Sequence, residues 1–203
     1  DAKQGIFDLG RFSRNNKNVL DGLGGGETTT KFIGSLYDET SGIGGRYIFL
    51  GSMRVAEVRN GVALFYLTDH LGGTNLLTDE KGLVKELCEY LPFGGFSRHE
   101  KFGGPQETAW FYFTGKALDE ETGLYYYGAR YYNPLIGRFI TPDTIVQNPG
   151  GNPQTLNRYT YCNNNPVNLV DPTGHSWFSK LWKKVSGFFA SAVGTALGFI
   201  NPF

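Results

Sequence analysis

A turn motif that recurs about every forty residues places the strongest constraint on how this chain can fold. The segments DETSG, DEKG and DEETG begin at Asp38, Asp79 and Asp119, so they lie 41 and 40 residues apart. In each segment the aspartate can accept hydrogen bonds from the backbone ahead, and the glycine can take a positive φ. Units that repeat at such a period must stack on one another to bury their apolar faces. The repeat therefore predicts successive strand-turn-strand units.

The residues between these turns form short runs that are typical of β-strands. The runs are apolar or alternate with polar residues, and many hold β-branched or aromatic side chains, as in GRYIFLGSMRVAEVRNGVALFYLTDH. The chain has 12 Tyr, 16 Phe and 29 Gly, a composition that suits many short hairpins. The pair Asn60-Gly61 between two apolar runs indicates a two-residue hairpin turn. Because the period is two, a helical solenoid is excluded, and we expect a mainly β fold of successive hairpins.

The charge and cysteine content exclude several classes of function. Nineteen basic and nineteen acidic residues give a formal net charge of zero, so no overall field attracts nucleic acid or an anionic membrane. Cys88 and Cys162 show no CxxC or Cys/His spacing, so we expect two buried free thiols, with neither a disulfide framework nor a metal site. No cofactor is indicated. The opening DAKQGIFDLG lacks a signal-peptide pattern, so any export is expected to use another route or a preceding segment.

Three regions of the chain differ in their pattern. Residues 1–30 mix Asn, Gly and charged residues without a sustained period, which predicts an irregular flank. Residues 31–174 carry the hairpin pattern, except that three prolines and a glycine pair in residues 141–161 predict irregular chain with at most a short helical turn. Residues 175–203 show no turn signal before Asn201-Pro202 and predict a hydrophobic helical tail. The length of 203 residues suits one domain with a separate tail.

The tail would place small side chains along one stripe of its helix. At a spacing of four, the stripe consists of Ser186, Ala190, Gly194 and Gly198. Small residues at this spacing let two helices approach closely, as they do in pairs of membrane helices. The apolar run from Val185 to Ile200 is shorter than the roughly twenty residues that span a bilayer. Two interpretations remain open: a helix packed inside a shell or against another subunit, and a membrane-active segment.

Three extended motifs follow one another between residues 66 and 174. They are YLTDHLGGTNLLTDEKGLVKELCEYLPFG, FTGKALDEETGLYYYGARYYNPLIGRFITPD and NRYTYCNNNPVNLVDPTG. In this order, within residues 31–174, they resemble the rearrangement-hotspot (RHS) or YD-repeat proteins, specifically their repeat-associated core. The resemblance implies a spiral of β-hairpins that wraps into a hollow shell and encloses a C-terminal toxic or effector region. Members include insecticidal ABC toxin complexes, polymorphic toxins of bacterial competition and the teneurins, which implies a secreted or cell-surface protein of a bacterium.

The same resemblance implies a self-cleavage site. Toxin members of the family cut their own chain just after the DPxG turn, by chemistry that resembles an aspartyl protease. The matching residues are Arg130 of GARYY, Asp143 of GRFxxPD and Asp171 of DPxG, and the cleavage turn contains Pro172 and Gly174. The family pattern usually has an apolar residue, most often Leu, after that glycine, whereas this sequence has His175.

Two carboxylates held close together suit peptide hydrolysis, because one can activate water while the other donates a proton. Their like charges raise the pKa of one member, and Arg130 would stabilise the member that stays ionised. Asp143 and Asp171 can form such a pair only if the fold brings two distant turns together. The alternative is a structural role, since Asp-Pro starts turns and D-P-x-G is itself a turn pattern.

Other chemically active side chains favour structural roles. His70, beside Asp69 and a hairpin glycine, indicates a turn residue rather than a base, and the three histidines are scattered along the chain. Five tyrosines in alternation are expected to fill both faces of a β-wall rather than to bind a sugar. They are Tyr125, Tyr126, Tyr127, Tyr131 and Tyr132.

Two functions of different classes remain open on the sequence. The first is an RHS core that builds or closes a shell with the rest of its protein, holds a C-terminal effector that starts in residues 175–203, and cleaves itself. The second is a non-catalytic subunit whose copies assemble edge to edge into a tube or filament, with the tail docked into a neighbour. A weaker third is a cell-surface adhesion module. Because residues 31–174 cannot enclose a cavity alone, we expect either a longer protein or further copies of the chain.

Overall fold

The computed structural model describes residues 5–6, 16–20, 27–33, 36–40, 42–104, 107–144 and 153–175. Within these residues the chain forms two antiparallel β-sheets and three short 3₁₀ helices, with no α-helix. This confirms the prediction of a mainly β fold. None of the helices in these residues has the length and apolar character needed to cross a bilayer. The predicted stripe of Ser186, Ala190, Gly194 and Gly198 lies outside the described residues.

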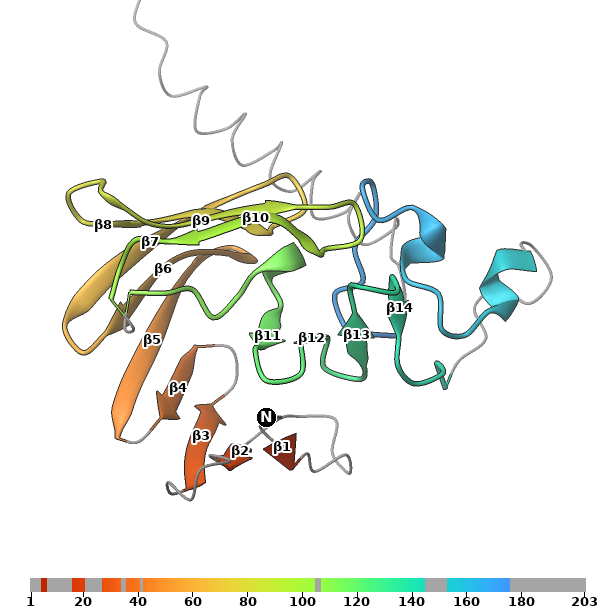
Figure 1. Ribbon diagram of the computed structural model, residues 1–203, viewed down its shortest axis with the longest axis horizontal. Helices are drawn as coiled ribbons and strands as arrows, with labels where there is room; N and C mark the ends of the chain where they lie inside the picture. The colour runs from red at the N-terminus through yellow and green to blue at the C-terminus, as the bar shows by residue number, and fades with distance from the viewer. Residues whose placement is uncertain are drawn as a thin grey trace, which may run out of the picture.

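The larger sheet has ten strands, and each strand pairs with the next one along the chain. Figure 1 shows them as a curved ribbon that runs from β1 to β10. All of these pairings are antiparallel. The strands are β1 (Gly5–Ile6), β2 (Asn16–Leu20), β3 (Glu27–Ile33), β4 (Tyr37–Thr40), β5 (Ile43–Leu50), β6 (Met53–Arg59), β7 (Val62–Thr68), β8 (Thr74–Asp79), β9 (Val84–Tyr90) and β10 (Phe96–Lys101).

The smaller sheet has four strands, again paired in chain order, and lies beside the β9–β10 turn (Figure 1). The hydroxyl of Tyr125 donates to the carbonyl of Gly94 over 3.1 Å, and that of Tyr132 donates to the carbonyl of Phe93 over 2.8 Å. These bonds fix the small sheet against the turn. Its strands are β11 (Ala117–Asp119), β12 (Leu124–Tyr126), β13 (Tyr131–Asn133) and β14 (Arg138–Phe139), and the 3₁₀ helices are η1 (Phe113–Gly115), η2 (Pro153–Leu156) and η3 (Cys162–Asn164).

The hairpin turns follow the residues that the sequence marks. Asn60 and Gly61 join β6 to β7 with φ values of 51° and 78°, which are the two positive values that a type I′ turn needs. In the second repeated turn, Asp79 Oδ1 accepts hydrogen bonds from the backbone N–H groups of Lys81 and Leu83, each over 2.9 Å. The glycines of the three repeated turns all have positive φ: Gly42, Gly82 and Gly123.

Asp38 departs from the predicted repeat. Its carboxylate does not cap a turn but is fully buried and accepts from the Arg59 guanidinium through both oxygens, over 2.7 and 3.0 Å. Tyr47 also donates to it over 2.5 Å. Because the side chain lies on a strand rather than at its end, it faces the covered side of the sheet and needs a cationic partner.

Charged side chains lie on the covered face of the larger sheet. Glu57 is fully buried and accepts from the Tyr66 hydroxyl, while burial raises the pKa of Glu57 and this hydrogen bond lowers it. The segment 107–112 covers this face, with Phe111 under the Arg54 guanidinium at 3.3 Å from the ring centroid and Trp110 beneath Arg59. The sheet therefore buries charges by pairing and stacking them rather than by excluding them.

Aromatic rings make up most of the core around the smaller sheet. Seven rings are buried there: Tyr112, Phe113, Tyr125, Tyr127, Tyr132, Phe139 and Tyr161. The rings of Tyr132 and Tyr161 lie 4.6 Å apart between centroids, a typical packing distance for aromatic pairs. Tyr126 and Tyr131 contact each other at 5.3 Å and are half-buried. The predicted use of both faces of the tyrosine-rich strands is thus confirmed.

The thiols also agree with the prediction. Cys88 and Cys162 are both free and buried. Burial raises the pKa of the Cys88 thiol to about 12 and raises that of Cys162 further above its usual range. Both thiols therefore keep their protons at neutral pH in the metal-free protein.

Within residues 1–30, predicted to be an irregular flank, the described residues form β1, β2 and the start of β3. β2 pairs with β3 in a register that places Asn18 opposite Thr29 and Val19 opposite Thr28. The β2 sequence NKNVL has no strict period of two, so the neighbouring strand and not the side-chain pattern determines its conformation. Between residues 141 and 161, the described residues hold only the short helix η2 and an isolated bridge at Thr160, as the prolines predict.

Replacing Gly61 by alanine should lower the free energy of unfolding by about 1–2 kcal/mol, because a side chain is strained at positive φ. The space around Gly61 is open, so the effect would come from the backbone alone. Gly95→Ala is the control, since its added methyl would meet Leu91 at an ordinary 3.7 Å and its φ is not in the left-handed region. Urea denaturation of the three proteins gives the comparison. Equal losses in both variants would contradict the type I′ geometry.

Candidate functional site

The DPTG segment forms a turn that its own aspartate closes. Asp171 Oδ1 accepts from the backbone N–H of Thr173 over 3.1 Å and from that of Gly174 over 2.8 Å. Gly174 has φ of 78°, which a residue with a side chain rarely adopts. Asp171 therefore has the structural role of a turn residue. Its other carboxylate oxygen, Oδ2, faces Arg130.

The loop between β12 and β13 holds this turn in place. The N–H of Ala129 donates to the carbonyl of Thr173 over 3.1 Å. A Cβ on Gly174 would lie 3.0 Å from the carbonyl oxygen of Tyr127 and 3.1 Å from the backbone nitrogen of Arg130, so the two segments touch at backbone level. Gly128, with φ of 91°, would bring a Cβ to 3.3 Å from the same Thr173 oxygen. Two glycines thus allow the close approach of turn and loop.

Arg130 joins the turn to two other segments. Its Nε donates to the carbonyl of Gly174, and its Nη1 donates to the carbonyl of Arg158 over 2.9 Å. Its Nη2 lies 3.0 Å from Asp143 Oδ2 and 3.6 Å from Asp171 Oδ2. The guanidinium carbon lies 3.7 Å from the centroid of the Phe139 ring, which fixes its plane. One buried cation therefore contacts both carboxylates and a peptide carbonyl.

The electrostatics of the site follow from its burial. Arg130 is 6% exposed, Asp143 3% and Asp171 2%, so all three lie away from bulk water. Burial lowers the pKa of Arg130, while the charges of Asp143 and Asp171 raise it. Because the ordinary pKa of arginine is so high, the guanidinium stays charged at neutral pH and serves as a fixed positive group.

Asp143 connects the site to His175. It follows β14, and its backbone N–H donates to the carbonyl of Arg158 over 2.9 Å, the same carbonyl that Arg130 binds. Its Oδ1 lies 3.3 Å from His175 Nδ1. The residue that departs from the family pattern is thus accommodated beside the carboxylate, half-buried against it.

Lys116 is a member of the site that the sequence reasoning missed. Its ammonium donates to the carbonyl of Pro172 over 2.6 Å and lies 5.1 Å from the Tyr127 ring centroid. Burial lowers its pKa to about 8, while the charge of Asp171 acts in the opposite direction. No local pattern marks this lysine, because it reaches a segment 56 residues away along the chain.

The structure brings together most of the residues that the sequence singled out. Arg130, Asp143, Asp171, Gly174 and His175 meet at one place, whereas Pro172 is exposed and accepts from Lys116 through its carbonyl. His70 lies apart from this cluster and contacts the carbonyl of Val167 through Nε2 over 2.9 Å, as a structural residue does.

The arrangement has the components of peptide-bond hydrolysis. A cationic N–H points at the oxygen of a peptide carbonyl, which would stabilise negative charge on that oxygen. Two carboxylates share the same guanidinium nitrogen, so one could take a proton and the other could give one.

Comparisons with known proteins agree on one protein family. The Teneurin YD-shell family model matches residues 35–167, more than half of the chain. The tRNA(Glu)-specific nuclease WapA of Bacillus subtilis subsp. natto is 36% identical over an alignment of 151 residues, and the match covers 68% of this chain and 6% of WapA. The toxin subunit YenC2 of Yersinia entomophaga is 41% identical over 104 residues, 50% of this chain and 10% of YenC2.

A solved structure agrees with the fold. The crystal structure of TcdB2-TccC3 without its hypervariable C-terminal region has a TM-score of 0.63 and 25% identity, and the match covers 78% of this chain and 8% of that one. In all three comparisons the chain spans a tenth or less of the relative.

The lowered pKa of Lys116 predicts a pH effect on stability. In the unfolded chain a lysine keeps a pKa near 10.5, so between about pH 8 and pH 10 the unfolded state binds more protons at this position than the folded state. The free energy of unfolding of the native protein, minus that of Lys116→Met, should therefore rise over this range by about 1–3 kcal/mol. Urea denaturation at several pH values measures this difference. Parallel curves for the two proteins would contradict the lowered pKa.

Proposed function

Because this chain belongs to the Teneurin YD-shell family, we propose that residues 31–174 are part of a β-ribbon shell that encloses an effector region on the C-terminal side of Gly174. In this proposal residues 175–203 begin the enclosed region, and the partner is the rest of a longer bacterial protein that is secreted or exposed at the cell surface. Relatives with different named roles, a tRNA nuclease and a toxin subunit, share this segment. A segment common to proteins with different roles suits a scaffold better than an effector.

The curved ribbon supports the same proposal. Each strand of the larger sheet pairs with its chain neighbours, so β1 and β10 are the edge strands of the sheet within the described residues. Exposed strand edges invite pairing with further strands. In a shell these edges would continue into the preceding and following parts of the same ribbon.

The second part of the proposal is that the Arg130 cluster cuts the chain between Gly174 and His175. One observation carries it: the Arg130 side chain donates to the carbonyl of Gly174 while it contacts the carboxylates of Asp143 and Asp171. A turn needs only Asp171 for its closure. The buried arginine and the second buried carboxylate are beyond what a turn requires.

The reaction would proceed by addition of water to the carbonyl carbon of Gly174. One carboxylate takes a proton from the water as it adds, and Arg130 stabilises the negative charge that develops on the carbonyl oxygen. The other carboxyl group gives its proton to the nitrogen of His175, and the bond between that nitrogen and the carbonyl carbon breaks. The products are a carboxylate at Gly174 and a free amine at His175. The contact of Asp143 Oδ1 with the ring Nδ1 of His175 supports the choice of Asp143 as the acid in this proposal.

A non-catalytic subunit that assembles edge to edge is the alternative, and the edge strands β1 and β10 are the observation that favours it. If the tail docks into a neighbouring copy, deletion of residues 175–203 should reduce the number of chains per particle, obtained by light scattering as the particle mass divided by the chain mass. An unchanged number of chains would show that the tail does not hold the assembly together.

Replacing either Asp143 or Asp171 by asparagine should abolish cleavage, because an amide neither takes nor gives the required proton. Intact-mass spectrometry of the purified native chain should show two fragments that meet between Gly174 and His175, and each variant should show one uncut species. Asp171→Asn keeps an oxygen that can still accept from Thr173 and Gly174, so the turn should survive.

Asp79→Asn is the matched control, since Asp79 also closes a turn through Oδ1 but lies in the larger sheet. This variant should cleave like the native chain. An uncut native chain would contradict the cleavage proposal but not the shell proposal. Cleavage in both site variants would show that the two carboxylates are not needed for the reaction.

A further inference from the structure

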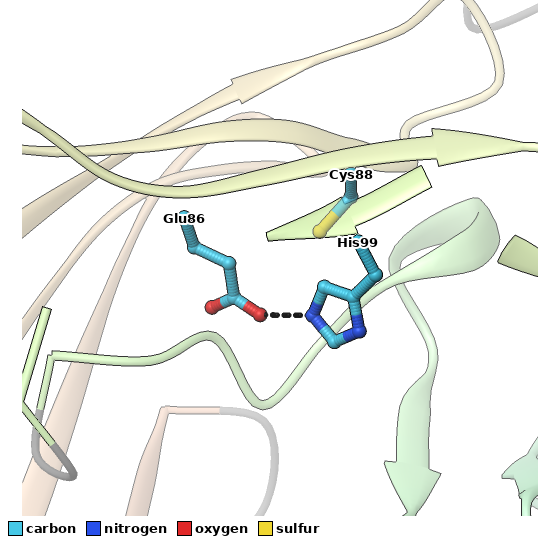
Figure 2. A group of neighbouring side chains, drawn as sticks. All are labelled: Glu86, Cys88 and His99. Carbon is cyan, nitrogen blue, oxygen red and sulfur yellow. Dashed lines mark hydrogen bonds and ion pairs between the residues drawn. The ribbon is translucent and has the colours of Figure 1, made fainter. Parts of the chain in front are cut away.

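Glu86, Cys88 and His99 form a second cluster of reactive side chains, well separated in the sequence from the Arg130 site. Glu86 and Cys88 are two residues apart on β9, so their side chains point to the same face of the sheet. His99 lies on β10 directly opposite Cys88 in the strand register. Figure 2 shows the three side chains turned toward one another.

The distances within this cluster suit a shared ion. A carboxylate oxygen, the Cys88 sulfur and a ring nitrogen of His99 all lie within 4.8 Å of one another. Atoms that share a tetrahedral zinc ion lie roughly 3.3–3.6 Å apart, given Zn–O and Zn–N distances of about 2.0–2.2 Å and Zn–S of about 2.3 Å. The Glu86 and His99 pair is closer, at 2.5 Å from Oε1 to Nε2, and would have to open by about 1 Å. Because His99 lies on the edge strand and is 23% exposed, it has room to move.

The groups around Glu86 make hydrogen bonds of the kind that orient the ligands of a metal ion. Glu86 is fully buried, its Oε2 accepts from the N–H of Ala109 over 2.6 Å, and its Oε1 accepts from the Tyr112 hydroxyl over 2.9 Å. The His99 ring stacks on Phe96 at 4.2 Å between centroids, a contact that sets the tilt of the ring but not its position within the ring plane. Hydrogen bonds and contacts of this kind orient metal ligands and are part of a binding site.

The charge of the cluster also favours a cation. Glu86 places an acidic group in the interior, and its Oε1 lies 2.5 Å from His99 Nε2. A carboxylate, a thiolate and a neutral imidazole together carry two negative charges, which match one divalent ion. A donor set of oxygen, nitrogen and sulfur suits zinc better than calcium or magnesium, which prefer oxygen alone.

We propose that Glu86, Cys88 and His99 bind one zinc ion, with water from the His99 side as the fourth ligand. Binding releases the thiol proton of Cys88 to solvent, and the imidazole binds through Nε2 with its hydrogen on Nδ1. The ion would tie the edge strand β10 to β9 and, through Glu86, to the segment of Ala109 and Tyr112. The sequence indicated no metal site, because the ligands come from two strands at a spacing that no local motif describes.

The test loads the full chain with metal. Protein stripped with a chelator is mixed with one equivalent of Zn²⁺, passed through gel filtration and analysed for metal content, and about one zinc per chain should be retained. Cys88→Ala and His99→Phe should each lose it, and the phenyl ring of the second variant preserves the stacking on Phe96. Cys162→Ala and His70→Gln are the matched controls, one the other buried thiol and one a histidine remote from the cluster, and both should retain zinc.

Cobalt gives an independent readout on the native chain. Co²⁺ in place of zinc should show the absorption of a thiolate-to-cobalt charge transfer, which reports a Co–S bond without any substitution. This measurement decides the proposal alone if the variants fail to fold. No retained zinc, zinc that survives both site variants, or a cobalt complex without the thiolate band would each overturn it.

Discussion

The contact of the Arg130 guanidinium with the Gly174 carbonyl and two aspartates is the interaction on which the C-terminal half of the structure depends. It links the β12–β13 loop, the segment after β14 and the DPTG turn, and it adds to the backbone bond from Ala129 to Thr173 and the contact of Asp143 with His175. A buried arginine without these acceptors would be costly, and so would the two carboxylates without the arginine. Each group thus requires the others, and the turn is held against the small sheet as a result.

In the larger sheet, too, buried charged side chains are paired with one another or with hydrogen-bond donors. Its covered face holds Asp38 with Arg59 and Glu57 with Tyr66, while apolar side chains of the opposite face, such as Ile48 and Phe65, are about half exposed. The covered face therefore holds paired charges among buried apolar side chains such as Leu64 and Leu77. It is stable because each buried charge has a partner that reaches it across neighbouring strands or from the covering segment 107–112.

Local turn chemistry made much of the fold predictable, and long-range partners explain what was missed. The type I′ turn at Asn60-Gly61 and the Asp79 turn follow from the residues that form them. Asp38 shares the motif of Asp79, yet it pairs with Arg59 from another strand, which no local pattern reveals. In the site, family motifs identified the arginine and both aspartates, whereas Lys116 could not be found because its partner is distant in the chain. The metal-binding proposal for β9 and β10 likewise needed the strand register.

The order of strands in the larger sheet also determines when the site can assemble. Neighbours in that sheet are neighbours in the chain, so each hairpin closes over a short loop at a small entropic cost and can fold early. The bonds from Arg130 to Arg158 and Gly174 join residues 28 and 44 positions apart and form only after the small sheet exists. Under the cleavage proposal, a chain whose small sheet has not yet formed would therefore be protected from early cleavage, because its Gly174 carbonyl would not yet lie beside Arg130 and the two aspartates.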